Sequence, residues 1–167
     1  MGEKLTRGDV EKIQNEIEHR KLVVRKEALE AVKEARAQGD LSENFEYKSA
    51  KQIKNQNEGR IRYLEKVLKN AQIISDDTAE DEVGLDNTVE LYIEDDDEVE
   101  TYRLVTSIRG SSLRGLISTE SPLGKAIYRH KVGDRVYVRV DDRNGYYAVI
   151  RAIRREADES TDEIRSY

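Results

Sequence analysis

Apolar residues recur at intervals of three and four along two stretches of this chain, within residues 8–37 and 50–71. Such spacing places apolar side chains on one face of a helix, and Gly39 stands where the first helix would stop. Only residues 38–44 separate the two stretches, and so short a link makes two helices antiparallel neighbours. The first part of the chain is therefore expected to form a helical hairpin.

Asn57 falls on the expected seam of this hairpin, where a polar side chain can fix the register of two helices at some cost in stability. The other predicted seam positions are Val10, Ile13, Ile17, Val24, Ala28, Ala31 and Ala35 in the first helix and Ala50, Ile53, Ile61, Leu64, Leu68 and Ala71 in the second.

The second part of the chain has the pattern of a sheet. Segments rich in Val, Ile, Thr and Tyr occupy residues 88–94, 99–108, 115–119, 134–140 and 146–153. Turn residues separate them, and Asn144-Gly145 is a strong hairpin signal. Ser121 and Pro122 suit the cap and first turn of a short helix. We expect an α+β protein whose second domain is a small antiparallel β-sheet with one short helix.

Charge divides the chain in the same way. Residues 1–75 carry 16 basic and 13 acidic side chains, and the remainder carries 13 basic and 22 acidic ones. The acidic residues 76–84 are typical of a linker. The predicted organisation is a coiled-coil hairpin over 1–75 with its tip at 38–44, a second domain over 85–157, and a frayed acidic tail over 158–167.

Composition excludes several classes of site and location. The chain has no Cys and two His, which excludes a disulfide framework, a Cys-based zinc site and a thiol nucleophile. No window approaches the roughly 20 apolar residues of a membrane span. We expect a soluble, cytoplasmic protein that makes no contact with membranes.

Two carboxylates, Asp40 and Glu43, lie at the predicted hairpin tip. Asp40 could cap the second helix with Glu43 as its capping-box partner. Alternatively, the pair could share a Mg²⁺ ion, which takes one or two protein carboxylates and completes its shell with water and phosphate. Two acids alone make no complete active site, so in the second case they would complete a site on another molecule.

Basic side chains flank the tip at Arg36, Lys48, Lys51 and Lys54. They could contact nucleic-acid phosphates, or form the solvated face of an ordinary helix. Tyr47 could stack on a base, or pack at the base of the turn.

The tip motif GDLSENFEY of residues 39–47, with residues 58–74, closely resembles the GreA/GreB family of bacterial transcript cleavage factors. Later segments agree in order and spacing: TYRLV from Thr101, LIS from Leu116, ESPLGKAI from Glu120 and KVGDRVYV from Lys131. The resemblance covers residues 5–156.

The resemblance implies an N-terminal coiled coil and a C-terminal domain with an FKBP-like fold. It also implies bacterial RNA polymerase as the partner: the second domain docks at the rim of the secondary channel, and the hairpin enters it. The factor would then stimulate the polymerase's own cleavage of backtracked RNA, without being an enzyme itself.

Roles follow from the resemblance, position by position. Asp40 and Glu43 match the acidic pair that helps to hold a Mg²⁺ ion shared with the polymerase. The residues that match positions at the tip or facing the nascent RNA 3′ end are Arg36, Ser42, Tyr47, Lys48 and Lys51. Glu120, Ser121 and Pro122 match the polymerase-docking loop. Phe45 departs from the pattern, because that position is usually Ala.

Two other functions stay open, and we expect a monomer in each case. One is a related factor that occupies the channel and regulates polymerase without stimulating cleavage. The intact acidic pair argues against it, since inhibitory relatives have remodelled tips. The other is prolyl isomerase activity of the FKBP-like domain, which lacks the Trp and Phe that would line such a pocket.

Overall fold

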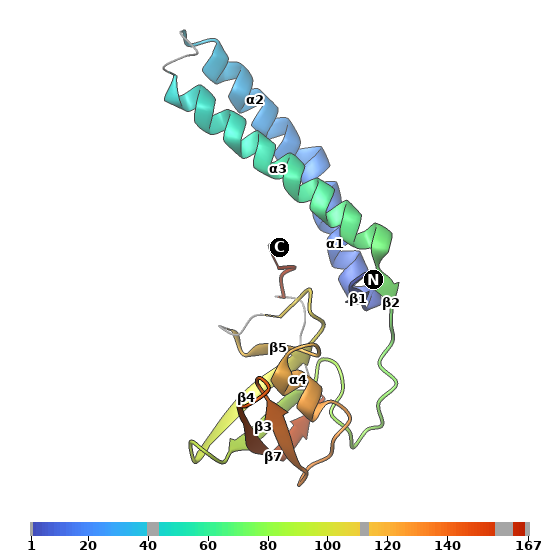
Figure 1. Cartoon of the computed structure of the whole chain (residues 1–167). Coiled ribbons are helices and arrows are strands. Elements are labelled where there is room, and N and C mark those ends of the chain that lie inside the picture. Colours follow the sequence, from blue (N-terminus) through green and yellow to red (C-terminus); the bar gives the residue numbers. More distant parts are fainter. Residues whose placement is uncertain (1, 40–43, 111–113, 156–161, 166–167) are drawn as a thin grey trace. The chain divides into compact units, whose positions relative to one another are not determined.

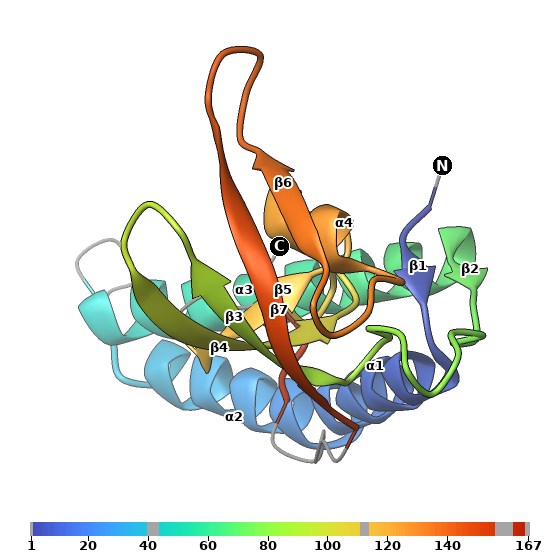
Figure 2. The same ribbon diagram turned by 90° about the horizontal axis from the view of Figure 1, so that it is seen from below.

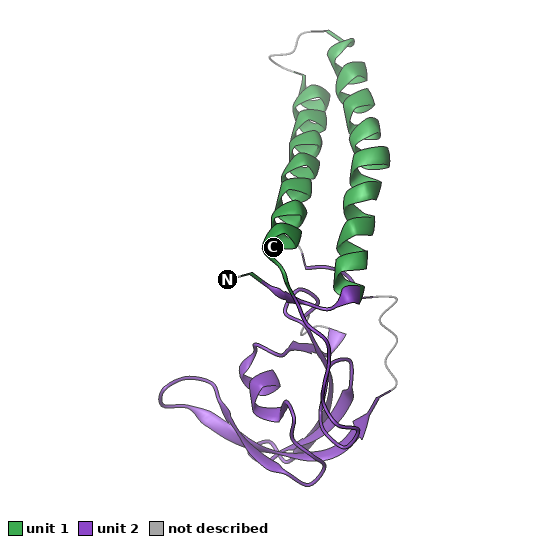
Figure 3. Cartoon of the chain, turned by 90° about the vertical axis from the view of Figure 1, so that its right-hand side faces the viewer, with its two compact units in different colours: residues 1–2, 8–72, 166–167 green, residues 3–7, 73–165 purple. Residues whose placement is uncertain are grey.

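The computed structural model describes residues 2–39, 44–110, 114–155 and 162–165. The chain divides into two compact units (Figure 3), one built around residues 8–72 and the other from residues 3–7 and 73–165. Among the described residues, no helix is both long enough and apolar enough to cross a membrane.

The first unit is the predicted helical hairpin (Figure 1). Its first arm runs through α1 (Arg7–His19), a π-helical turn η1 (Arg20–Val24) and α2 (Arg25–Arg36). Its second arm is α3 (Phe45–Asn70), which packs antiparallel to α2. The 3–4 spacing of apolar residues therefore identified both arms correctly.

The seam of the hairpin follows most of the predicted positions. The buried ones are Ile13, Ala28, Ala35, Ala50, Asn57, Ile61 and Leu64. Ile53 was predicted on the seam and is wrong, since its side chain is 54% exposed. Ala31 is also exposed. Val67, near the end of α3, was not predicted on the seam but is buried. The buried face of a straight α-helix drifts around the helix relative to a seven-residue repeat, which brings such a residue to the seam.

Asn57 meets the π-helical turn. Its Oδ1 accepts a hydrogen bond from the Arg20 guanidinium at 3.0 Å, and its Nδ2 donates to the Arg20 carbonyl at 3.3 Å. The same carbonyl accepts the N–H of Arg25, the residue that ends the turn. The buried amide therefore binds both the side chain and the backbone of one residue on the opposite arm.

The second unit holds a five-stranded sheet in the order β5-β4-β3-β7-β6 (Figure 2). The strands are β3 (Thr88–Ile93), β4 (Glu98–Val105), β5 (Leu116–Ser118), β6 (Arg135–Arg139) and β7 (Gly145–Arg154). Three pairings are antiparallel, as predicted. The β4–β5 pair is parallel, so the sheet is mixed. Separately, β1 (Lys4–Leu5) and β2 (Gln72–Ile73) pair as a two-stranded sheet.

The short helix α4 (Pro122–Ile127) begins as the sequence predicts. Ser121 is its N-cap and Pro122 its first residue. Leu123 and Ile127 join the core that β3, β6 and β7 form with Val89, Leu91, Val136, Val138, Ala148 and Ile150. The helix thus covers one face of the sheet, and the loop before it is fixed to that core.

Residues 162–165 are anchored to the second unit. The fully buried carboxylate of Asp162 pairs with Arg103 and, at 3.2 Å, with Arg109. The Arg109 guanidinium also pairs with Asp86 at 2.8 Å. A frayed tail is therefore the wrong description of these four residues, because a buried ion pair holds them.

Candidate functional site

The predicted tip residues fall into two groups. Asp40, Ser42 and Glu43 lie outside the described residues, and their roles stay predictions. The others lie on the helix ends on either side of that segment: Arg36 at the end of α2, and Tyr47, Lys48 and Lys51 in the first two turns of α3.

Asn44 fixes the start of α3 against the end of α2. Its Oδ1 accepts the N–H of Tyr47 at 3.0 Å, and its Nδ2 donates to the carbonyl of Ala35 at 2.7 Å. Asn44 is therefore the N-cap of α3, and the suggestion that Asp40 caps this helix is wrong. The helix begins four residues later than a cap at Asp40 would place it, so helix capping gives no reason for the two tip acids.

Gly39 ends the first arm with a backbone φ of +125°. Residues with a side chain rarely adopt this conformation. The sequence prediction of a stop at Gly39 is therefore consistent with the last turn of α2, which closes at Ala37. Together, Gly39 and Asn44 define where the chain leaves one helix and enters the other.

Three basic side chains lie near Tyr47. The Arg36 guanidinium lies 5.7 Å from the centroid of its ring. A hydrogen bond from Arg36 lowers the pKa of the Tyr47 hydroxyl, and the charges of Lys51 and Lys54 lower it further. The structure thus brings three of the predicted basic residues to one tyrosine from both arms of the hairpin.

The fourth basic residue, Lys48, lies beside Phe45. Its ammonium is 5.7 Å from the centroid of the phenyl ring, and Phe45 is 81% exposed. Sequence reasoning singled out Phe45 as a departure from the family pattern but missed the capping role of Asn44. The available signal was that Asn is a preferred N-cap.

The loop before α4 carries the other predicted site residues. The Ser121 hydroxyl accepts the N–H of Gly124 at 3.0 Å and donates to the Ser118 carbonyl at 2.6 Å. A Cβ at Gly124 would lie 1.9 Å from that carbonyl oxygen, so only glycine permits this close turn. Glu120 is exposed beside it, 3.9 Å from Lys4. Two hydrogen bonds and a close glycine contact thus fix the turn, and Glu120 is exposed to solvent beside it.

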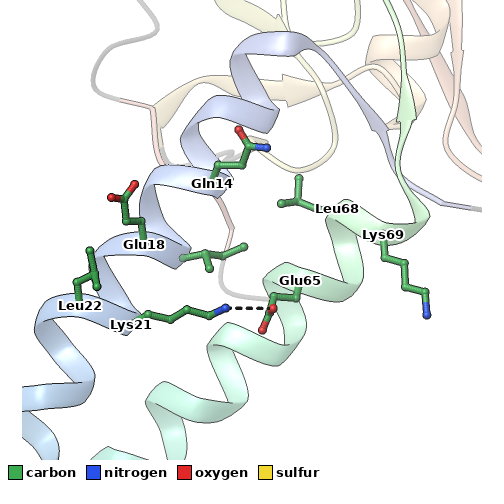
Figure 4. A pocket seen from close by; sticks show the side chains of 8 residues that line it. Gln14, Glu18, Lys21, Leu22, Glu65, Leu68 and Lys69 are labelled. Atoms are coloured by element: carbon green, nitrogen blue, oxygen red, sulfur yellow. Dashed lines mark hydrogen bonds and ion pairs between the residues drawn. The ribbon is translucent and has the colours of Figure 1, made fainter.

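An open groove of about 590 Å³ lies between the two arms (Figure 4). Its apolar lining comes from Ile17, Leu22 and Leu68. Lys21 and Glu65 pair across it at 3.3 Å and neutralise each other. The groove therefore offers apolar contact rather than catalytic groups. Across the described part of the chain, no group of three or more His, Asp or Glu could hold a metal ion.

Comparisons with known proteins agree over most of the chain. The family model for the N-terminal part of transcription elongation factors matches residues 3–73, and the GreA/GreB C-terminal model matches residues 78–154. The chain is 44% identical over 137 residues to transcription elongation factor GreA of Thermoanaerobacter pseudethanolicus, covering 81% of this chain and 87% of that protein.

Two further proteins illustrate the range of relatives. Transcription elongation factor GreA of Bacillus velezensis is 42% identical over 134 residues, which are 80% of this chain and 85% of that protein. The crystal structure of GreA factor homolog 1 of Thermus thermophilus matches with a TM-score of 0.43 at 28% identity, covering 92% of this chain and 99% of that one.

Proposed function

This chain belongs to the GreA/GreB family of transcription elongation factors, and on that basis we propose that it binds bacterial RNA polymerase and stimulates cleavage of backtracked RNA. The observation that carries the proposal is the hairpin end. There Asn44 ties α3 to the Ala35 carbonyl of α2, so the tip acids Asp40 and Glu43 are joined to two fixed helix ends.

The tip supplies carboxylates and the polymerase supplies the active site. Asp40 and Glu43 are a donor set that suits Mg²⁺ shared with substrate phosphate and water. When bound in the complex, the ion supplies a polarised phosphate and an activated water for phosphodiester hydrolysis. The two acids help to retain that ion and orient the water. The factor is accordingly not an enzyme by itself, and the reaction belongs to the polymerase.

The residues beside the tip hold the RNA. Arg36 and Tyr47 form one cation–aromatic pair, and Lys51 adds positive charge to it. Phosphate contacts of this kind give affinity without sequence preference, which suits a factor that meets whatever transcript has been extruded. Lys48 contributes on the same helix, and Ser42 belongs to the same motif.

The loop at Glu120, Ser121 and Pro122 docks the factor on the polymerase. Its Ser121 hydrogen bonds hold the loop in one conformation, and a rigid loop loses little entropy on binding. Docking and chemistry are thereby assigned to different units. We place the protein in the bacterial cytoplasm, acting as a monomer.

The test is transcript cleavage in a purified, backtracked elongation complex with Mg²⁺. We expect the wild type to stimulate cleavage, and Asp40→Ala or Glu43→Ala to lose the stimulation while binding polymerase with unchanged affinity. Lys69→Gln, which removes an exposed charge at the far end of α3, is the control and should cleave normally.

A different outcome would favour the second candidate. If the wild type binds polymerase and slows nucleotide addition but leaves the RNA uncut, the protein is a channel-binding regulator. If the tip variants lose binding as well as cleavage, the division of labour between the units is wrong.

A further inference from the structure

Phe45 is the most exposed large hydrophobic side chain among the described residues, at 81%. It is also the only phenylalanine of the chain. Burying a phenyl ring stabilises a fold, and the hairpin forgoes that gain at this position. The fold itself therefore gives no reason for the ring, and a contact with another molecule would supply one.

The start of α3 holds Phe45 in a defined position. The residue follows the N-cap Asn44 directly and is the first residue of the helix. Asn44 is in turn bound to the Ala35 carbonyl and the Tyr47 N–H. The backbone that carries the ring is thus fixed to both arms of the hairpin, which limits the entropy that a contact through the ring would lose.

Cations accompany the aromatic rings at this end of the hairpin. Lys48 lies 5.7 Å from the centroid of the Phe45 ring, and Arg36 lies 5.7 Å from that of Tyr47. A surface that contacts single-stranded nucleic acid combines exposed rings, on which bases stack, with cations for the phosphates between them. An apolar pocket of a protein would need the ring alone, so the paired cations favour RNA.

We propose that Phe45 stacks on an unpaired base of the RNA that reaches the hairpin tip, with Lys48 contacting an adjacent phosphate. This rests on the proposed function, because backtracked RNA is the single strand delivered to that site. Phe45 would therefore add affinity for the RNA without taking part in the chemistry of Asp40 and Glu43.

The first measurement is the factor concentration that gives half-maximal cleavage in the backtracked complex. One stacked base is worth about 1–3 kcal/mol, so Phe45→Ala should raise this concentration by about tenfold with the maximal rate retained. Phe45→Trp should match the wild type, and Phe45→Leu should behave like Phe45→Ala. Ile53→Ala, which trims another exposed apolar side chain of α3, is the control and should have no effect.

The second measurement reads the contact without cleavage. The Asp40→Ala variant should not stimulate cleavage, so a backtracked transcript with 4-thiouridine at its 3′ end can be crosslinked to it by light before much of the RNA is cut. We expect a crosslink at Phe45 that disappears when Phe45→Ala is added to the variant.

The two readouts separate this inference from the proposed function. A wild type that stimulates no cleavage but crosslinks at Phe45 would reject the proposed function and support the stacking contact. Absence of the crosslink, or full activity of Phe45→Ala at wild-type concentration, would overturn the contact. A Phe45→Leu variant as effective as Phe45→Trp would replace base stacking by an apolar contact with the polymerase.

Discussion

Asn57 places an amide at a seam position that is only 3% exposed. Its two hydrogen bonds to Arg20 explain how the hairpin tolerates it, because a buried polar group is costly only when it lacks partners. The partner is specific to this register: sliding α3 by one turn would move the amide away from Arg20. Asn57 therefore favours one alignment of the two arms.

Asn57→Ala should lower the free energy of unfolding of the hairpin by about 1–3 kcal/mol, because the Arg20 carbonyl and guanidinium lose a buried partner. Urea titration followed by far-ultraviolet circular dichroism measures this loss. Asn55→Ala, at an exposed position of the same helix, should change the free energy by less than about 0.5 kcal/mol. Equal changes in the two variants would show that the hydrogen bonds between Asn57 and Arg20 contribute nothing to stability.

Single residues also show which contacts could not be predicted from the sequence. Asn57 was identified on the seam from spacing alone, yet its partner Arg20 was not, since that contact depends on which face the π-helical turn presents. Ile53 fits the same spacing and is exposed. Asp40 was one candidate for the cap of the second helix, and the sequence alone does not separate it from Asn44, because local propensity ranks Asp and Asn alike.

Among the helices, ion pairs link the two arms of the hairpin. Glu16 of α1 accepts hydrogen bonds from Arg60 of α3 at 2.8 and 3.2 Å and from Arg20 at 2.8 Å. Arg25 and Glu58 make a bidentate pair at 2.9 Å further along. Burial raises the pKa of Glu16, but the hydrogen bonds and charges of Arg60 and Arg20 outweigh it and leave the pKa below its ordinary value of 4.5.

A lowered carboxyl pKa in the folded state gives a definite sign to the pH dependence. Glu16 stabilises the hairpin above pH 4.5, its ordinary pKa, and this contribution is lost as the pH falls through the lower folded value. Thermal unfolding of the helices should therefore occur at lower temperature in acid, and Glu16→Gln should reduce the difference between neutral and acidic solution. Glu11→Gln, at an exposed position of α1, should leave the difference unchanged; the same effect from both variants would point to net charge alone.

The helices and strands were easier to predict from the sequence than the irregular features within and between them. Each arm and each strand of the sheet has a periodicity that its own residues supply. The π-helical turn and the parallel β4–β5 pair have no such local signal. A π turn inserts one residue into a helix, and its first residue here, Arg20, contacts Asn57 across the hairpin. Sequence spacing leaves the direction of β5 relative to β4 open.

For the whole molecule, the motif at residues 39–47 pointed to the family, and the comparisons confirm it along both units. The motif also nominated Asp40 and Glu43, whose placement lies outside the described residues. The structure adds the contacts of the two helix ends that flank this segment. Asn44 links α3 to the end of α2, and two cation–aromatic pairs lie close to it in the sequence. The Asn44–Ala35 and Arg36–Tyr47 contacts join residues from both arms, so the pattern within one stretch of sequence does not predict them.

If docking resides in the second unit and chemistry in the hairpin tip, an inactive tip should make the factor a competitor. Asp40→Ala added in excess over the wild type should suppress cleavage of a backtracked transcript in proportion to its share of the total factor. Adding Glu120→Lys to Asp40→Ala should remove this suppression, because Glu120 is an exposed residue of the proposed docking loop and its reversal leaves the core untouched. A titration of each variant against a fixed amount of wild type measures both effects. Suppression that persists in the double variant would move the docking surface away from this loop, and no suppression by Asp40→Ala would mean that the tip itself contributes most of the binding.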